Sequence, residues 1–217
     1  MDMRYLSALV LLCAVSTTAQ AQKQLFNGRN TSGWQFLGAP NTTGFVVNAG
    51  LLDTGGAKGM LWYTGEKIGN AKIRVVFRMS NENGNSGVFI RIPVEPKSEG
   101  DAIHKGIEVQ IDNRDNDWHC TGTLYSMTQA KARPSKPAGE WNTMEITLDG
   151  LRTIVHVNGV LVTDYDGVSP VPERKQSYEP ERGPRPEFGY IGLQNHDASA
   201  VISFKEISVE PLTKKKS

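Results

Sequence analysis

The stretch MEITLDGLRTIVHVNGVLVTDY, residues 144–165, decides the fold class. Two dipeptides divide it: Asp149-Gly150 precedes RTIVHV, and Asn158-Gly159 separates RTIVHV from VLVTDY. Asp-Gly and Asn-Gly accept the positive φ that two-residue hairpin turns require. The stretch therefore predicts a three-stranded antiparallel meander over Asn142–Leu148, Thr153–Asn158 and Val160–Tyr165.

Short runs rich in Val, Ile, Phe and Thr continue on both sides of this meander, and no segment carries a sustained helical period. Gly, Asn, Asp and Pro separate the runs, which is typical of an all-β domain. The other predicted strands are Phe45–Asn48, Leu51–Asp53, Met60–Tyr63, Lys72–Met79, Gly87–Ile92, Gly106–Asp112, Thr123–Ser126, Gly189–Gln194 and Val201–Glu210. About twelve strands in one domain are too many for a single open sheet and predict a sandwich of two packed antiparallel sheets.

Two segments are predicted to be loops. Pro93–Lys105 is polar, and Gly167–Glu187 is rich in proline and charge. A long loop without secondary structure is usually functional or disordered. We therefore expect Gly167–Glu187 to border a binding cleft.

The N-terminus has the pattern of a secretory signal. Arg4 supplies a positive charge, Leu6–Val15 is apolar, and Ala19-Gln20-Ala21 forms a cleavage site of the A-x-A type. The apolar run is too short to span a bilayer, which needs about 20 residues. We expect cleavage after Ala21, a secreted or periplasmic protein without a transmembrane segment, and a single β-sandwich domain over residues 22–217.

Charge and cysteine content exclude several classes of protein. The net charge of +1 gives no basic face for nucleic acid. Cys120 is the only cysteine after residue 21, so no intramolecular disulfide can form, and we interpret it as structural or incidental rather than catalytic. The sequence has no G-x-S-x-G elbow, phosphate-binding glycine loop, H-E-x-x-H zinc helix or dinucleotide fingerprint.

The strand GIEVQID, Gly106–Asp112, contains the strongest candidate site. Successive side chains of a strand point to opposite faces. The apolar side chains expected in the core are Ile107, Val109 and Ile111. The polar side chains expected on the opposite face are Glu108, Gln110 and Asp112. Two carboxylates and an amide without Lys or Thr favour a functional face over an ordinary solvated one.

Two more strands contribute candidates to the same face. Phe89 and Arg91 alternate with apolar residues in Gly87–Ile92. An aromatic ring beside a guanidinium can bind a sugar, although a structural role for Arg91 is an equal alternative. In the strand beginning at Gly189, Gln194 and His196 point outward, and His196 is either catalytic or an ordinary surface histidine.

Six motifs together resemble the 3-keto-disaccharide hydrolase domain family. They are LFNG with SGW (residues 25–34), SGVFIR (86–91), GIEVQID (106–112), TGTLY (121–125), GEWN (139–142) and IGLQNH (191–196). They follow the family's order through nearly the whole chain. The resemblance implies a concanavalin A-like lectin/glucanase jelly roll and cleavage of glycosides oxidised to a ketone at C3.

The resemblance also relates the E-x-Q-x-D strand to the E-x-D-x-E catalytic strand of glucanases with this sandwich. Here Gln110 replaces the central acid and Asp112 the last glutamate. Residues four apart on a strand have Cα atoms about 13 Å apart. Glycosidases need carboxyl groups about 5–9.5 Å apart, so Glu108 and Asp112 fit the ordinary two-carboxylate mechanism poorly.

A 3-keto sugar needs only one base, because the ketone acidifies the hydrogen on C2. Our hypothesis makes Glu108 or Asp112 this base, and Arg91 or a bound divalent cation polarises the keto oxygen. Gln110, Gln194 and His196 hold hydroxyls or protonate the leaving oxygen, and no cofactor is otherwise expected. The alternatives are a carbohydrate-binding module without catalysis, using the same concave face, and a structural domain of a cell-surface assembly.

Overall fold

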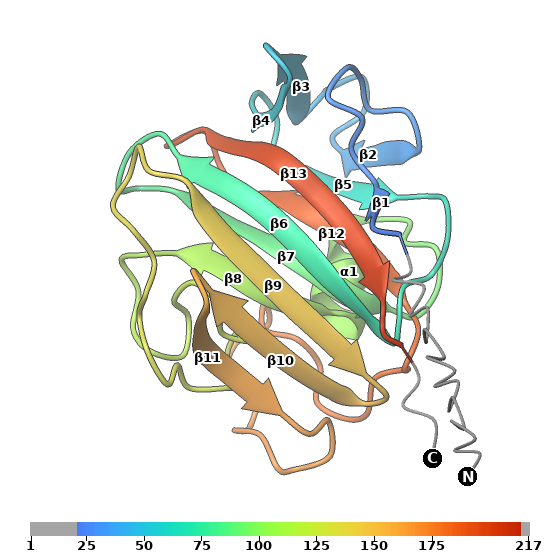
Figure 1. The fold of residues 1–217 in the computed structure, drawn as a ribbon, viewed down its shortest axis with the longest axis vertical. Helices are drawn as coiled ribbons and strands as arrows, with labels where there is room; N and C mark the ends of the chain where they lie inside the picture. Colours follow the sequence, from blue (N-terminus) through green and yellow to red (C-terminus); the bar gives the residue numbers. More distant parts are fainter. Residues whose placement is uncertain (1–20, 214–217) are drawn as a thin grey trace, which may run out of the picture.

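The computed structural model describes residues 21–213 as two antiparallel β-sheets packed face to face (Figure 1). The strands of the eight-stranded sheet are β1 (Lys23–Gln24), β3 (Phe45–Asn48), β4 (Leu51–Thr54), β6 (Ala71–Met79), β9 (Asn142–Asp149), β10 (Arg152–Val157), β11 (Val160–Tyr165) and β13 (Ile202–Pro211). Those of the five-stranded sheet are β2 (Trp34–Gly38), β5 (Gly59–Tyr63), β7 (Asn85–Ile92), β8 (Ile107–Asp112) and β12 (Tyr190–Asn195). The predicted all-β jelly-roll sandwich is confirmed.

Strand order follows from the pairings. The eight-stranded sheet runs β11-β10-β9-β6-β13-β4-β3, with β1 paired to β13, and the five-stranded sheet runs β2-β5-β12-β7-β8. The predicted signal segment lies outside the described residues except for Ala21. Among the described residues, no helix has the length and apolar character needed to cross a membrane.

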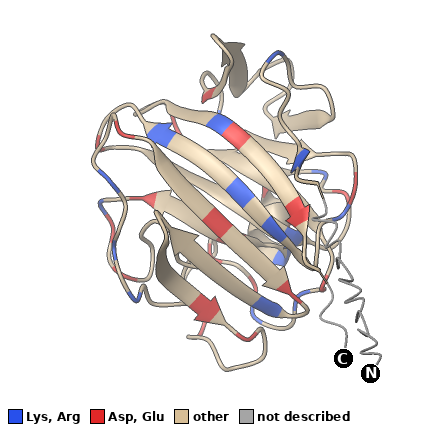
Figure 2. Cartoon of the chain, in the orientation of Figure 1, with Lys and Arg blue, Asp and Glu red and all other residues tan. Residues whose placement is uncertain are grey.

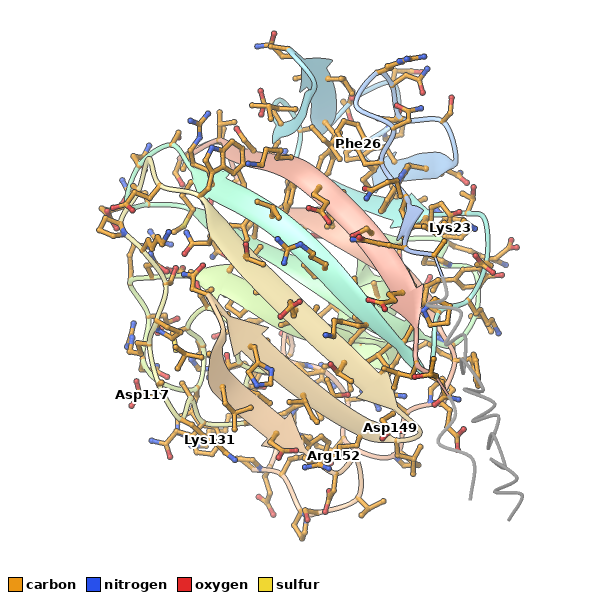
Figure 3. The ribbon with its side chains drawn as sticks, in the orientation of Figure 1. Lys23, Phe26, Asp117, Lys131, Asp149 and Arg152 are labelled. Carbon is orange, nitrogen blue, oxygen red and sulfur yellow. The ribbon has the colours of Figure 1, made fainter. Side chains whose placement is uncertain are left out.

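The meander β9-β10-β11 forms as its turn residues predict. Gly150 has φ +55°, and Asn158 and Gly159 have φ +51° and +80°. Asp149 and Arg152 flank the first turn (Figure 3) and pair directly across it. The first turn is therefore formed by Gly150 and Leu151, one residue later than the predicted dipeptide, and the second by Asn158 and Gly159 as predicted.

Apolar side chains from both sheets form one core. In β8, Ile107, Val109 and Ile111 enter it, which confirms the predicted alternation of that strand. They meet core residues of β6 and β9, such as Val75 and Ile146. Burial of one face fixes the register of each strand, because a slip of one residue would turn its apolar set to solvent.

The outer face of the eight-stranded sheet carries charges of both signs (Figure 2). Arg74 contacts Glu145 at 3.7 Å and Glu206 at 3.3 Å. Exposed pairs of this kind contribute about 0–1 kcal/mol each. This face is therefore an ordinary solvated surface. The outer face of the five-stranded sheet differs from it, because that face carries the candidate site described below.

Two local predictions were wrong, and two short strands were missed. A helix, α1 (Glu99–Lys105), occupies the expected loop Pro93–Lys105, begins after the N-cap Ser98, and buries Ala102. The segment Thr123–Ser126 is not a strand, since Leu124 makes only an isolated bridge to Val109. The short strands β1 and β2 were not predicted.

Candidate functional site

A cavity of about 380 Å³ opens on the outer face of the five-stranded sheet, beside α1. Its lining comes from β7, β8, β12, α1 and loops. The lining residues are Lys58, Asn85, Ile103, Glu108, Gln110, Tyr125, Tyr178, Gln194 and His196. The structure thus brings together four residues singled out from the sequence: Glu108, Gln110, Gln194 and His196. Tyr178 comes from the proline-rich loop that was expected to border a cleft.

Glu108 is the most perturbed carboxyl group of this cavity. Removal of water raises its pKa to about 8, and the negative charge of Glu99 adds to this effect, while Lys58 opposes it. Gly87, on the adjacent strand, leaves the space that the carboxyl group fills. A carboxyl group with such a pKa in a cavity is typical of a general acid or base.

Two glutamine side chains hold the carboxyl groups in place. With its amide oriented to satisfy its neighbours, Gln110 donates to Glu108 Oε1 at 3.2 Å and to Ser86 O at 3.0 Å. Gln194 Nε2 donates to Glu99 Oε1 at 3.5 Å. Gln194 Oε1 is buried and has no partner among the described residues, so it can accept a hydrogen bond from a ligand hydroxyl.

His196 lies at the end of β12, where Nδ1 is 2.8 Å from Asp197 Oδ2. Its side chain is 41% exposed, so the imidazole meets both the cavity and solvent. A carboxylate on one ring nitrogen favours a proton there and orients the ring. Nε2 is then the atom available to a ligand.

Sequence reasoning missed Glu99, Lys58 and Tyr125. Burial raises the pKa of Glu99, and Lys58 opposes this. Burial, together with the charge of Glu108, raises the pKa of Tyr125 far above its ordinary value, so its phenol remains a hydrogen-bond donor. One signal was available: Ser98-x-x-Asp101 is a capping pattern that predicts a helix starting at Glu99.

Phe89 lies on the predicted face but cannot serve as a sugar platform. Its side chain is 0% exposed, because α1 covers this part of the sheet. It packs in a small apolar cluster with Met60, Trp62, Ile92 and Ala102. The missed helix explains the error.

Arg91 was placed on the wrong face. Its φ of +56° lies at an irregularity in the β7–β12 pairing, which breaks the alternation of the strand. The side chain is 1% exposed and donates to the carbonyl oxygens of Gly150 (2.9 Å), Arg152 (3.0 Å) and Pro186 (2.8 Å). Arg91 joins the β9–β10 turn to the proline-rich loop and does not reach the cavity.

Asp112 does not share the cavity with Glu108. Both of its carboxylate oxygens accept from the Arg114 guanidinium, at 3.1 and 2.8 Å, and the Arg114 backbone N–H also donates to it. It lines a separate hollow near Cys120. The geometry therefore leaves Glu108 as the candidate base on β8.

The divalent cation stays a prediction. In the part of the chain that the structure describes, no group of three or more His, Cys, Asp and Glu side chains is arranged to hold a metal ion.

Comparison with known proteins agrees with the motifs. The model of the family described as "3-keto-alpha-glucoside-1,2-lyase-like domain" matches residues 21–210. The comparison with curated proteins gave no match.

Solved structures show the same sandwich. A candidate glycosyl hydrolase from Parabacteroides distasonis superposes with a TM-score of 0.71 at 25% identity, covering 88% of this chain and 100% of that one. A second one from the same organism gives 0.72 at 20% identity, covering 88% and 94%. The carbohydrate-binding module CBM66 of Bacillus subtilis gives 0.54 at 15% identity, covering 82% and 95%, which shows the fold alone.

Proposed function

Because the chain belongs to the 3-keto-alpha-glucoside-1,2-lyase-like domain family, we propose that it cleaves glycosides whose sugar carries a ketone at C3. The observation that supports this most is the desolvated carboxyl group of Glu108 in a polar cavity on the outer face of the sandwich. The family and the solved structures that resemble this chain both support a carbohydrate-related function.

In the first step, the Glu108 carboxylate removes the proton from C2, next to the ketone. The electron pair of the C2–H bond forms a C1=C2 double bond, the C1–O bond breaks, and the leaving oxygen takes a proton. A base with a raised pKa is stronger once ionised, which suits a carbon acid. Gln110 holds the carboxyl oxygen from the side.

In the second step, water adds across C1=C2. While the C1=C2 intermediate is bound, the protonated Glu108 exchanges its proton with solvent. The hydroxyl of the water then goes to C1, Glu108 delivers a solvent-derived proton to C2 and becomes a carboxylate again, and the remaining proton of the water goes to the group that protonated the leaving oxygen. The net reaction is hydrolysis of the glycosidic bond.

The other cavity residues have roles that follow from their chemistry. Arg91 does not reach the cavity, so we assign its expected role to Lys58, which stabilises the negative charge that develops on the keto oxygen. His196, held by Asp197, protonates the leaving oxygen, and Gln194 Oε1 accepts a sugar hydroxyl.

One experiment separates the candidate functions. The purified protein is incubated with the 3-keto and the unoxidised form of one disaccharide, with and without a chelator. Cleavage of the keto form alone supports the proposal, and loss of that cleavage with chelator assigns a role to a divalent cation. Cleavage of both forms favours an ordinary hydrolase using Glu108 and Glu99, and binding without cleavage favours a carbohydrate-binding module.

We also propose that the protein acts after secretion, in the periplasm or outside the cell. This rests on the N-terminal pattern from Arg4 to Ala21. N-terminal sequencing of the protein purified from its host should begin at Gln22, and a chain starting at Met1 would contradict the proposal.

A further inference from the structure

A second cavity, of about 320 Å³, lies next to the first. Two segments form both cavities. Tyr125 and Tyr178 line the first, while the residues that follow them, Ser126 and Glu179, line the second. Tyr125 also contacts His119 of the second cavity, with ring centroids 4.6 Å apart. The two cavities therefore share a wall of aromatic side chains.

The surface of the second cavity is mainly apolar and includes the Trp118 ring, although most of the residues that line it are polar or charged. The lining residues are Asn116, Trp118, His119, Ser126, Pro172, Glu173, Lys175, Glu179 and Arg182. Positive and negative side chains are both present, so nothing selects a charged ligand. An apolar surface with a small number of oriented polar groups is what a neutral sugar ring requires.

The polar groups of this cavity are held in place before any ligand arrives. The carboxyl group of Glu179 is buried, and its Oε2 accepts from Lys175 N and Arg182 Nη2, each at 3.0 Å. Arg182 also donates to Pro172 O at 2.6 Å and to Ser126 O at 3.3 Å, which ties the proline-rich loop to the segment that carries Trp118. Fixed groups of this kind reduce the ordering that binding requires.

We propose that this second cavity binds the leaving-group sugar of the substrate, with the ring of that sugar against Trp118. Each cavity is close to the lower end of the range of about 300–1,000 Å³ typical of small-molecule sites, so a two-ring ligand needs both. Glu179 and the Trp118 indole are the groups expected to bind its hydroxyls. The inference rests on the proposed function, because it assigns the reacting 3-keto ring to the Glu108 cavity.

The test compares two substrates with the same 3-keto-glucosyl ring, one leaving as glucose and one as methanol. Trp118→Ala should lower kcat/KM about tenfold for the disaccharide and leave the methyl glycoside within about twofold, since only the first reaches Trp118. Trp141→Ala is the matched control, because Trp141 lies beside Arg78 and Lys205 of the other sheet. If Trp118→Ala lowers kcat/KM equally for both substrates, or for neither of them, the inference is overturned.

A binding measurement keeps the inference testable if turnover is absent. In the Glu108→Gln background, calorimetry with both glycosides should show tighter binding of the disaccharide, and Trp118→Ala should remove that difference. Absence of turnover in the wild type with this binding pattern present would reject the proposed reaction but keep the subsite. Turnover without the binding pattern would reject the subsite alone.

Discussion

Gly87 of β7 lies directly beside the side chain of Glu108 of β8, and a β-carbon at position 87 would collide with the Glu108 carboxyl group. The glycine thus provides the space in which this carboxyl group is buried. Gly87→Ala should displace Glu108 and lower kcat with 3-keto-disaccharide at least tenfold, while circular dichroism shows an intact sandwich.

Gly55→Ala is the matched control for this variant, because a β-carbon there meets only an ordinary contact with Val46. It should retain wild-type turnover. Unchanged turnover in Gly87→Ala would mean that the position of the carboxyl group does not limit the reaction.

Glu108→Gln should lower kcat by about 10²- to 10⁴-fold, the range typical of a general base. The amide occupies the same space, so melting temperature should not fall. Glu145→Gln, on the outer face of the eight-stranded sheet, is the control and should be fully active. Full turnover by Glu108→Gln would remove Glu108 from the mechanism.

The raised pKa of Glu108 predicts a rising pH profile. The base acts when ionised and its pKa is about 8, so kcat/KM should rise about tenfold per pH unit below 8 and level off above it. Lys58 lowers this pKa, so Lys58→Met should move the rise to higher pH. A flat wild-type profile between pH 6 and pH 9 would contradict this assignment.

The same shift predicts a pH-dependent stability. The folded state holds the Glu108 proton up to pH of about 8, whereas the unfolded chain releases it near 4.5. Because the native state binds more protons in this window, the unfolding free energy should fall as pH rises through it. Urea denaturation at pH 5 and pH 8 should show that the unfolding free energy falls more between these pH values for the wild type than for Glu108→Gln. An equal fall in the two proteins would mean that the pKa of Glu108 is near its ordinary value.

Arg91 is expected to contribute to stability alone. Arg91→Met leaves the partly buried carbonyl oxygens of Gly150, Arg152 and Pro186 without their donor, and should cost about 2 kcal/mol of unfolding free energy. Arg78→Met, on the other sheet, should change it by less than about 0.5 kcal/mol. If Arg91→Met has the stability of the wild type but an altered KM, Arg91 contributes to substrate binding and this assignment is wrong.

The sequence predicted those parts of the fold that depend on local chemistry. Gly150 and the dipeptide Asn158-Gly159 accept the positive φ of the two hairpin turns, so the meander could be predicted from these residues. The face of Glu108 and Gln110 could be predicted because Ile107 and Val109 alternate with them and must be buried.

The errors have equally local causes. Alternation fails at Arg91, because one positive φ reverses the direction of its side chain. Phe89 was assigned to an open face, since α1 has only seven residues and is too short to give a helical period. Lys58 and Tyr125 lie outside any strand, so only the tertiary structure brings them to Glu108.

The most direct test of Glu108 as a C2 base is the reaction run in D₂O with a 3-keto-disaccharide, followed by NMR of the released 3-keto sugar. Elimination, exchange of the Glu108 proton with solvent and hydration predict deuterium at C2 of the product from the wild-type protein, and at least about a hundredfold slower product formation by Glu108→Gln. Cleavage that retains hydrogen at C2 would contradict the proposed chemistry.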